Sequence, residues 1–175
     1  MADKLYFAYG SNINLDQMAQ RCPDAQVVGS VRLEGYELLF RGATRGYGVA
    51  TIAPKEGGFV HGLLWKLTPQ SEQALDMYEG YPRLYDKELV TVRDAEGRGL
   101  SVMAYVMTNL PQRAPALPSP YYYNGIQEGY RDNGLPLGAL KQAWEHCARE
   151  IHQETERINR TLTKQLKRGG GREVR

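Results

Sequence analysis

The sequence contains few of the residues that most often build metal and redox sites. Its 175 residues include two cysteines, Cys22 and Cys147, and three histidines. Two cysteines cannot form a disulfide framework, and neither has a second cysteine or a histidine at metal-ligand spacing. His146 precedes Cys147, but adjacent residues point apart on a helix. We therefore expect no metal and no cofactor.

Long apolar runs and an excess of charge of one sign are also missing. No apolar run approaches the roughly 18 residues that span a bilayer, and charges at Asp3 and Lys4 do not fit a signal peptide. Lys and Arg total 22 against 20 Asp and Glu, whereas a nucleic-acid binder needs a strong basic footprint. We expect a soluble, cytoplasmic protein with neither membrane nor nucleic acid as a partner.

Motifs for nucleotide binding and for nucleophilic catalysis are absent from the sequence. It has no G-x-G-x-x-G, no Walker loop, no H-E-x-x-H and no G-x-S-x-G elbow. The histidines at 61, 146 and 152 form no triad with Ser11, which has no partner near it in sequence. The sequence thus offers no support for a serine or cysteine nucleophile.

Tyrosine, by contrast, is abundant: there are 12, beside three Phe and two Trp. Tyrosine combines apolar area with a terminal hydroxyl, so the excess predicts a polar pocket or an interface. Hydrophobic residues make up 42% and charged residues 24%, which is ordinary globular composition. The length fits about one domain.

Short apolar segments separated by turn signals predict seven strands, at residues 4–9, 25–33, 36–40, 49–54, 59–67, 85–92 and 100–107. Tight hairpins are expected around residues 55–58 and 94–97. Helices are expected to begin at the caps Asn14, Thr68 and Ser119, with Pro in the first turn of the latter two. Tight turns favour antiparallel pairing, so we expect an α+β fold with a curved or barrel-like sheet.

The C-terminal segment continues one helical stripe beyond this domain. We place the domain at residues 1–140 and a helix with a basic, Gly-rich tail at 141–175. The stripe comprises Leu140, Trp144, Cys147, Ile151, Ile158 and Leu162. Either its first half packs on the domain and its second half is solvated, or the stripe forms a homodimer seam. Residues 164–175 are expected to fray.

Two places can hold chemistry. The turn Tyr9–Asn12 lies between a strand and a helix, where Gly10 allows close backbone approach and free N–H groups attract an anion. The alternative is an ordinary tight turn with an N-cap. Glu79 sits in the last turn of a helix, where the dipole disfavours its charge and raises its pKa, as suits a general base. The alternative is a surface glutamate paired with Arg83 or Lys87.

These residues carry a resemblance to a known family. The segment YFAYGSN, residues 6–12, resembles the N-terminal signature of the γ-glutamylcyclotransferases. The resemblance continues through RCPDAQVVGSVRLEGYELLF, GVATIAP, GLLWKLT, LDMYEGYPRLYDKELVTV, AYVMTN and SPYYYNGIQEGYRDNGLPL, in the family's order. It covers about residues 4 to 140, and the pairing of YGSN with a downstream LDxxEG makes it specific.

The resemblance implies a compact α+β barrel that releases 5-oxoproline from a small γ-glutamyl substrate without a cofactor. It places the catalytic glutamate on Glu79. The substrate loop falls on Tyr6, Phe7, Ala8, Tyr9, Gly10, Ser11 and Asn12, and two further substrate-binding tyrosines fall on Tyr85 and Tyr122. Because residues 121–123 are all tyrosine, the last assignment can shift by one.

The leaving group stays open at this point. The segment Tyr81-Pro82-Arg83 after the glutamate leans toward the γ-glutamylamine branch of the superfamily. One alternative is a cyclotransferase that removes a γ-glutamyl protecting group from a biosynthetic intermediate. Another is a catalytically silent member that binds a small ligand or a protein. The chemistry itself needs no enzyme nucleophile, because the substrate's α-amine attacks its own γ-carbonyl.

Overall fold

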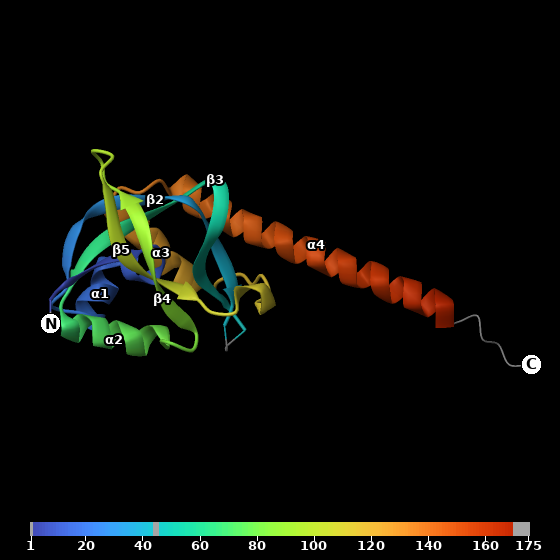
Figure 1. The fold of residues 1–175 in the computed structure, drawn as a ribbon. Helices are drawn as coiled ribbons and strands as arrows, with labels where there is room; N and C mark the ends of the chain where they lie inside the picture. The colour runs from blue at the N-terminus through green and yellow to red at the C-terminus, as the bar shows by residue number, and fades with distance from the viewer. Residues whose placement is uncertain (1, 44–45, 170–175) are drawn as a thin grey trace, which may run out of the picture.

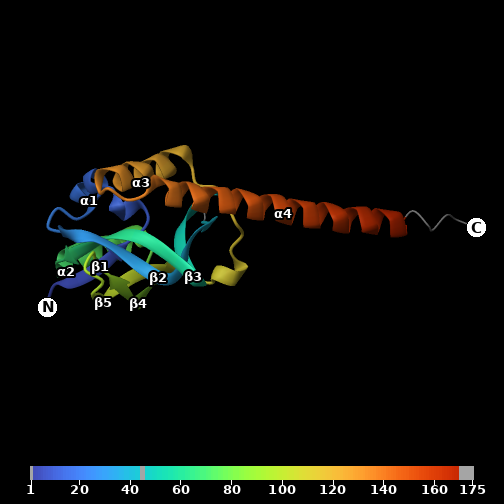
Figure 2. The same cartoon turned by 90° about the horizontal axis from the view of Figure 1, so that it is seen from above.

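The computed structural model describes residues 2–43 and 46–169. Its elements are β1 (Lys4–Ala8), η1 (Ser11–Ile13), α1 (Leu15–Arg21), β2 (Gln26–Gly42), β3 (Gly48–Leu67), α2 (Pro69–Glu79), β4 (Tyr85–Arg93), β5 (Gly99–Met107), η2 (Leu110–Gln112), α3 (Pro120–Asp132) and α4 (Leu137–Gly169). Helices α1 and α3 lie side by side on one side of the sheet, and α4 runs past it into solvent (Figures 1 and 2).

The five strands close into a barrel in the order β1-β3-β2-β4-β5. β1 closes it, because this short strand pairs antiparallel with β3 and parallel with β5. Tyr6 is opposite Trp65 on one side and Met103 on the other. The structure confirms the predicted α+β barrel and places the N-terminal strand in its core.

The strands between residues 25 and 67 differ from the prediction. Instead of four short strands there are two long ones, β2 and β3, which pair antiparallel from Gln26 opposite Lys66 to Gly42 opposite Gly48. The pairing skips residues 55–58, which bulge out opposite Gly35. Gly35 and Gly57 have φ of 78° and 73°, and glycines with positive φ occur in bulges as well as in turns. The expected hairpin at residues 55–58 is therefore wrong.

The predicted helix starts are confirmed by side-chain caps. Asn14 Oδ1 accepts from the backbone N–H of Gln17 at 3.0 Å, and Thr68 Oγ1 accepts from that of Ser71 at 3.1 Å. The Ser119 hydroxyl caps α3 in the same way. Such caps satisfy N–H groups that have no partner within the helix. They therefore fix where each helix begins.

The root of α4 packs on the barrel. Leu140 and Cys147 are fully buried, and Arg41 of β2 holds Glu150 through two hydrogen bonds of 2.9 Å. The rest of α4 projects into solvent and stays helical to Gly169. The expected fraying is thus wrong for residues 164–169, while residues 170–175 lie outside the described part.

Candidate active site

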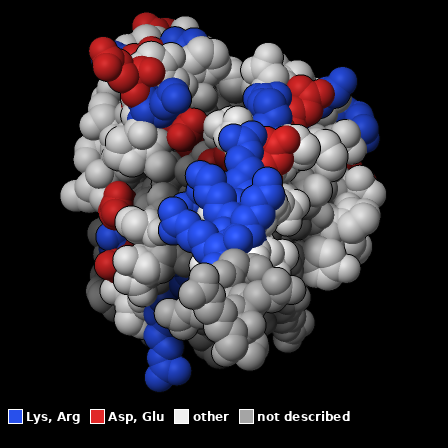
Figure 3. Space-filling view, turned by 90° about the vertical axis from the view of Figure 1, so that its right-hand side faces the viewer, with Lys and Arg blue, Asp and Glu red and all other residues white. Residues whose placement is uncertain are grey.

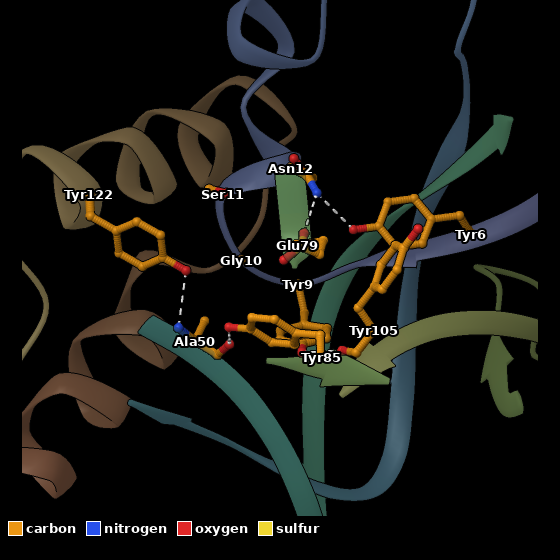
Figure 4. Close-up of a pocket in the computed structure, with 10 residues that line it drawn as sticks. All are labelled: Tyr6, Tyr9, Gly10, Ser11, Asn12, Ala50, Glu79, Tyr85, Tyr105 and Tyr122. Atoms are coloured by element: carbon orange, nitrogen blue, oxygen red, sulfur yellow. Dashed lines mark hydrogen bonds between the residues drawn. The ribbon is translucent and has the colours of Figure 1, made fainter. Parts of the chain in front are cut away.

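A small pocket lies where η1, the end of α2 and the start of α3 meet the barrel (Figure 4). Its lining consists of Tyr6, Tyr9, Gly10, Ser11, Asn12, Ala50, Glu79, Tyr85, Tyr105 and Tyr122. Most of the residues predicted from the sequence are therefore brought together. Phe7 and Ala8 are not among them, because both are fully buried in the barrel core.

Glu79 is the last residue of α2 and faces this pocket. Gly80 follows in the left-handed conformation, with φ of 65°, and turns the chain away. Burial raises the pKa of Glu79 to about 7, although the charge of Arg21 and a hydrogen bond from Asn12 lower it. Exclusion of water, and not the helix dipole expected from the sequence, is the main cause of the raised pKa. Near neutral pH the carboxyl group can both accept and donate a proton.

The predicted surface pairings of Glu79 are not observed. The Lys87 ammonium lies 2.7 Å from Glu72 and 2.8 Å from Asp76. Within residues 2–43 and 46–169, no ion pair joins Arg83 to Glu79. The glutamate is therefore turned toward the pocket and not toward neighbouring cations.

Asn12 connects the turn to the glutamate. Its Nδ2 donates to Glu79 Oε1 at 2.9 Å and to the Tyr6 hydroxyl at 3.0 Å, and its Oδ1 accepts from Arg21 Nη1 at 2.7 Å. The side chain of Asn14, two residues on, caps α1. The segment thus has both of the roles left open by the sequence, a capped turn and a pocket wall.

Five tyrosines supply most of the remaining wall, in keeping with the tyrosine excess. Tyr85 donates its hydroxyl to the carbonyl of Ala50 at 2.6 Å, and the Tyr122 hydroxyl accepts from the N–H of Ala50 at 3.0 Å. Tyr9 donates to the carbonyl of Tyr105. Burial raises the pKa of each of these phenols and of Tyr6. They are neutral at physiological pH and serve as hydrogen-bonding groups.

The three consecutive tyrosines separate clearly in the structure. Tyr122 lines the pocket, Tyr121 is 81% exposed, and Tyr123 packs near Phe40, with ring centroids 6.4 Å apart. A helix turns adjacent side chains in different directions, so only one of the three can face the site. The geometry supports Tyr122 as the tyrosine of the pocket.

Sequence reasoning missed Ala50, Tyr105 and Arg21. Ala50 lies on β3 and Tyr105 on β5, and the barrel alone brings them to the pocket. Arg21 ends α1 and contacts Asn12 from outside the lining. The general excess of tyrosine was a signal for Tyr105, but nothing local marked Ala50.

Comparisons with known proteins agree with this geometry. A family model described as "Gamma-glutamyl cyclotransferase, AIG2-like" matches residues 6–124. The γ-glutamylcyclotransferase of Bos taurus is 37% identical over 145 residues, or 79% of this chain and 76% of that protein. That of Homo sapiens is 37% identical over 141 residues, or 76% and 73%. A solved γ-glutamyl cyclotransferase superposes with a TM-score of 0.73 at 32% identity, covering 81% of this chain and 86% of that chain.

The chain therefore belongs to the γ-glutamyl cyclotransferase, AIG2-like family, which is a family of enzymes. The resemblance predicted from residues 4 to 140 is confirmed. Within the described ranges no helix is long and apolar enough to cross a membrane. In the same part of the chain, no three His, Cys, Asp or Glu side chains are grouped to hold a metal ion.

Proposed function

We propose that the chain converts a small γ-glutamyl compound into 5-oxoproline and a free amine, with Glu79 as the general acid and base. The observation that carries the proposal is the carboxyl group of Glu79, which has a pKa of about 7 and faces a pocket of neutral hydrogen-bonding groups. Family membership supports the reaction class. The pocket supports the assignment of the proton carrier.

In the proposed step, the carboxylate of Glu79 takes a proton from the substrate's α-ammonium group. The free amine nitrogen then attacks the γ-carbonyl carbon and forms the ring C–N bond. Protonated Glu79 gives its proton to the leaving nitrogen as the original amide C–N bond breaks and the carbonyl re-forms. After attack the ring nitrogen still carries one surplus proton, which the regenerated carboxylate of Glu79 takes up and passes to the freed amine. Two protons thus move from the α-nitrogen to the leaving nitrogen, the leaving group departs as an ammonium ion, and Glu79 ends as the carboxylate.

The pKa of Glu79 suits both proton transfers, from the α-ammonium group and to the leaving nitrogen. An α-ammonium group has a pKa near 8, so transfer to a carboxylate with a pKa of about 7 is uphill by roughly one unit. A carboxylate near its ordinary value of 4.5 would face a larger deficit. Positioned acid–base catalysis contributes about 10²–10⁴-fold. The remaining rate acceleration is expected to come from holding the substrate ready for ring closure, since oriented intramolecular attack reaches effective molarities of about 10⁵–10⁸ M.

The turn at Gly10–Asn12 is proposed to hold the bent glutamyl chain. The first N–H groups of a helix have no partner inside it, and those of η1 begin at Ser11, on the pocket wall. They suit the α-carboxylate or the developing oxyanion. Tyr85 and Tyr122, both fixed to Ala50, are proposed to contact the substrate opposite this turn.

Replacing Glu79 tests the assignment directly. Glu79→Gln keeps the side chain's size and can still accept from Asn12, but it cannot take up the proton. We expect kcat to fall about 10²–10⁴-fold with a much smaller change in KM. Steady-state formation of 5-oxoproline at pH 7–8 measures both constants. If kcat holds and KM rises, Glu79 is a binding group and the proposed step is wrong.

We propose a small γ-glutamyl amide as the substrate class, because the relatives compared above are named γ-glutamylcyclotransferases. The test is a panel of γ-glutamyl-alanine, γ-glutamyl-ε-lysine and glutathione, assayed for 5-oxoproline. Turnover of the first identifies an amino acid leaving group, and preference for the second supports the amine branch. No product from any member would favour a silent binding protein or a larger biosynthetic substrate.

We propose two further properties of the protein, its location in the cell and its oligomeric state. The cytoplasm is proposed as its location, since Cys22 and Cys147 are both free and buried, as suits a reducing compartment. A homodimer is proposed through the outer half of α4, where Ile158, Leu162 and Leu166 are exposed on one stripe. Sedimentation of the full chain measures the second expectation.

A further inference from the structure

Arg21, the last residue of α1, lies outside the pocket lining and contacts Ser11 and Asn12 of the pocket wall as well as residues of α1 and α2 behind it. Its Nη1 donates to Asn12 Oδ1 at 2.7 Å and to Ser11 Oγ at 3.3 Å, and its Nη2 donates to Gln17 Oε1 at 2.8 Å. Its guanidinium carbon lies 3.7 Å from the centroid of the Tyr78 ring, within the range of a cation–π contact. This side chain therefore connects α1, η1 and the end of α2.

The contact with Asn12 determines which end of its amide faces the glutamate. An asparagine amide has an accepting oxygen and two N–H donors, whereas a guanidinium group only donates. Arg21 must therefore face Oδ1, which directs the two N–H groups of Asn12 toward Glu79 and Tyr6. If the amide turned over, its oxygen would face the carboxylate and repel the ionised form.

We propose that Arg21 is a positioning residue that acts on Glu79 through Asn12, by locking the amide so that an N–H donor faces the carboxylate. The kinetic part of this inference rests on the proposed function, but the orientation of the amide does not. Tyr78, stacked on the same guanidinium, is thereby also held beside Ser11, with the two hydroxyl oxygens 3.3 Å apart.

Arg21 contacts Glu79 only through Asn12, which suits a carboxyl group that must both take up and release a proton. Among the described residues Arg21 forms no ion pair with Glu79, and three of its five N–H donors bond to Ser11, Asn12 and Gln17. A direct pair would favour the charged carboxylate strongly and make its acid form hard to reach. The charge of Arg21 and the hydrogen bond from Asn12 both lower the pKa of Glu79, but without a direct ion pair burial still holds that pKa at about 7.

No other group at the pocket wall is expected to change charge near pH 7. The facing titratable groups are the phenols of Tyr6, Tyr9, Tyr85, Tyr105 and Tyr122, each with a raised pKa. Behind Tyr105, Asp76 accepts from that phenol and pairs with Lys87. Tyr78 also faces this region, with its hydroxyl oxygen 3.3 Å from that of Ser11. A titration near neutral pH therefore reports on Glu79.

The test compares Arg21→Met and Arg21→Lys with the unaltered chain. Carboxyl ¹³C NMR follows the ionisation of Glu79, with Glu79→Gln used to assign its signal, and kcat/KM is measured from pH 5.5 to 9. For Arg21→Met we expect the Glu79 titration and the acidic limb of the rate profile to move together to higher pH. A movement of the pKa by one unit from about 7 lowers the rate at pH 7 about fivefold. Arg21→Lys retains a donor for Asn12 and is expected to restore part of the shift.

Two further variants separate the proposed route from a general charge effect. Arg160→Met removes the same charge from an exposed position on α4 and is expected to leave the Glu79 titration unchanged. A double-mutant cycle combines Arg21→Met with Asn12→Ala. The shifts that the two substitutions cause in the Glu79 pKa should be less than additive, because Arg21 acts through the Asn12 amide. Fully additive shifts would show that Arg21 acts by charge alone and would overturn the proposal.

The outcomes also separate this inference from the proposed function. If the unaltered chain forms no 5-oxoproline, the proposed function fails, but the NMR titration still tests Arg21. If Arg21→Met does not fold, the comparison is made with Arg21→Lys, whose shift must lie in the same direction. An unchanged Glu79 titration in every folded Arg21 variant overturns the inference.

Discussion

Burial makes ionisation of Glu79 unfavourable in the folded chain, and the free energy of unfolding should therefore depend on pH. Its pKa is about 7 in the folded chain against an ordinary 4.5, so the unfolded chain loses this proton more readily. The stability that comes from keeping the group neutral is complete below pH 4.5 and is lost as the pH rises through 7. The shift corresponds to a loss on the order of 3 kcal/mol.

Glu79→Gln should therefore stabilise the chain at alkaline pH while abolishing most of its activity. We expect a higher Tm than that of the unaltered chain at pH 8 and a difference that shrinks toward pH 4.5. Thermal unfolding across this range measures it, with exposed Glu88→Gln as the matched control. A lower Tm for Glu79→Gln than for the unaltered chain at pH 8 would contradict the assigned cause of the shift.

Gly10 was expected to allow the backbone to come close to a ligand. Its φ is −116°, so the left-handed conformation is not the reason for glycine here. A Cβ at this position would lie 3.1 Å from the Cβ of Ala50 and 3.4 Å from the Tyr122 hydroxyl oxygen. Space at the pocket wall is therefore the constraint on this residue.

Gly10→Ala should accordingly weaken substrate binding more than it weakens the fold. The added methyl group would displace Tyr122 or Ala50, whose hydrogen bond forms one corner of the pocket. The measurement is substrate Kd in the inactive Glu79→Gln background, together with Tm. A lower Tm with unchanged Kd would remove Gly10 from the binding site.

At the scale of elements, local signals predicted helix starts better than strand connections. The caps at Asn14, Thr68 and Ser119 were correct because a cap involves residues only three apart. The bulge at residues 55–58 was predicted as a turn because both use Gly with positive φ. Only the pairing with β2, about 20 residues away, distinguishes them.

Prediction of the site was also limited to what local sequence segments reveal. The turn and Glu79 could be predicted because each lies in a recognisable segment, and Tyr85 and Tyr122 followed from the family resemblance. Arg21 and Tyr105 could not, since their roles depend on how α1 and β5 meet the pocket. Phe7 and Ala8 were included because they lie within the signature, but their side chains are buried in the core.

Two helical glycines give a matched test of how the elements pack. A Cβ on Gly129 of α3 would lie 2.8 Å from Ile13 Cγ2 and 2.9 Å from the backbone N of Asn14, whereas Gly138 of α4 has no atom within 4 Å. Gly129→Ala should therefore lose about 1–3 kcal/mol of stability through overpacking. Gly138→Ala should gain up to about 1 kcal/mol from helix propensity.

Chemical denaturation of both variants measures these changes. Because α3 also carries Tyr122, activity should fall with Gly129→Ala and stay constant with Gly138→Ala. Equal stability of the two variants would show that α3 can move away from η1 without cost.

For the molecule as a whole, the outer half of α4 is expected to be separable from the fold. Leu140 and Cys147 are buried at its root, but Ile158, Leu162 and Leu166 are 49%, 50% and 76% exposed. The outer turns are extended from an anchored helix, so they avoid the cost of initiation. Ion pairs between Glu154 and Arg157 and between Glu156 and Arg160 support them further.

Truncation after Gln153 should therefore leave Tm and cyclotransferase activity unchanged. If the exposed stripe joins two copies, the full chain should sediment as a dimer and the truncated chain as a monomer. Circular dichroism, the 5-oxoproline assay and analytical ultracentrifugation of both chains provide the measurements. A large loss of Tm or activity in the monomer would place the outer helix in the core or in the pocket wall.

The projecting helix also makes the protein suited to oriented attachment. Residues 152–169 add roughly 27 Å of helix at 1.5 Å per residue, directed away from the barrel (Figure 1). Figure 3, which views the molecule from this end, shows lysine and arginine side chains gathered toward the viewer. Because Cys22 and Cys147 are buried, a thiol introduced at the exposed Lys164, on the face of α4 opposite the stripe of Ile158 and Leu162, would react selectively with a maleimide dye or a sensor surface. The helix would then act as a rigid spacer that holds the barrel, together with the pocket at Glu79, away from the surface.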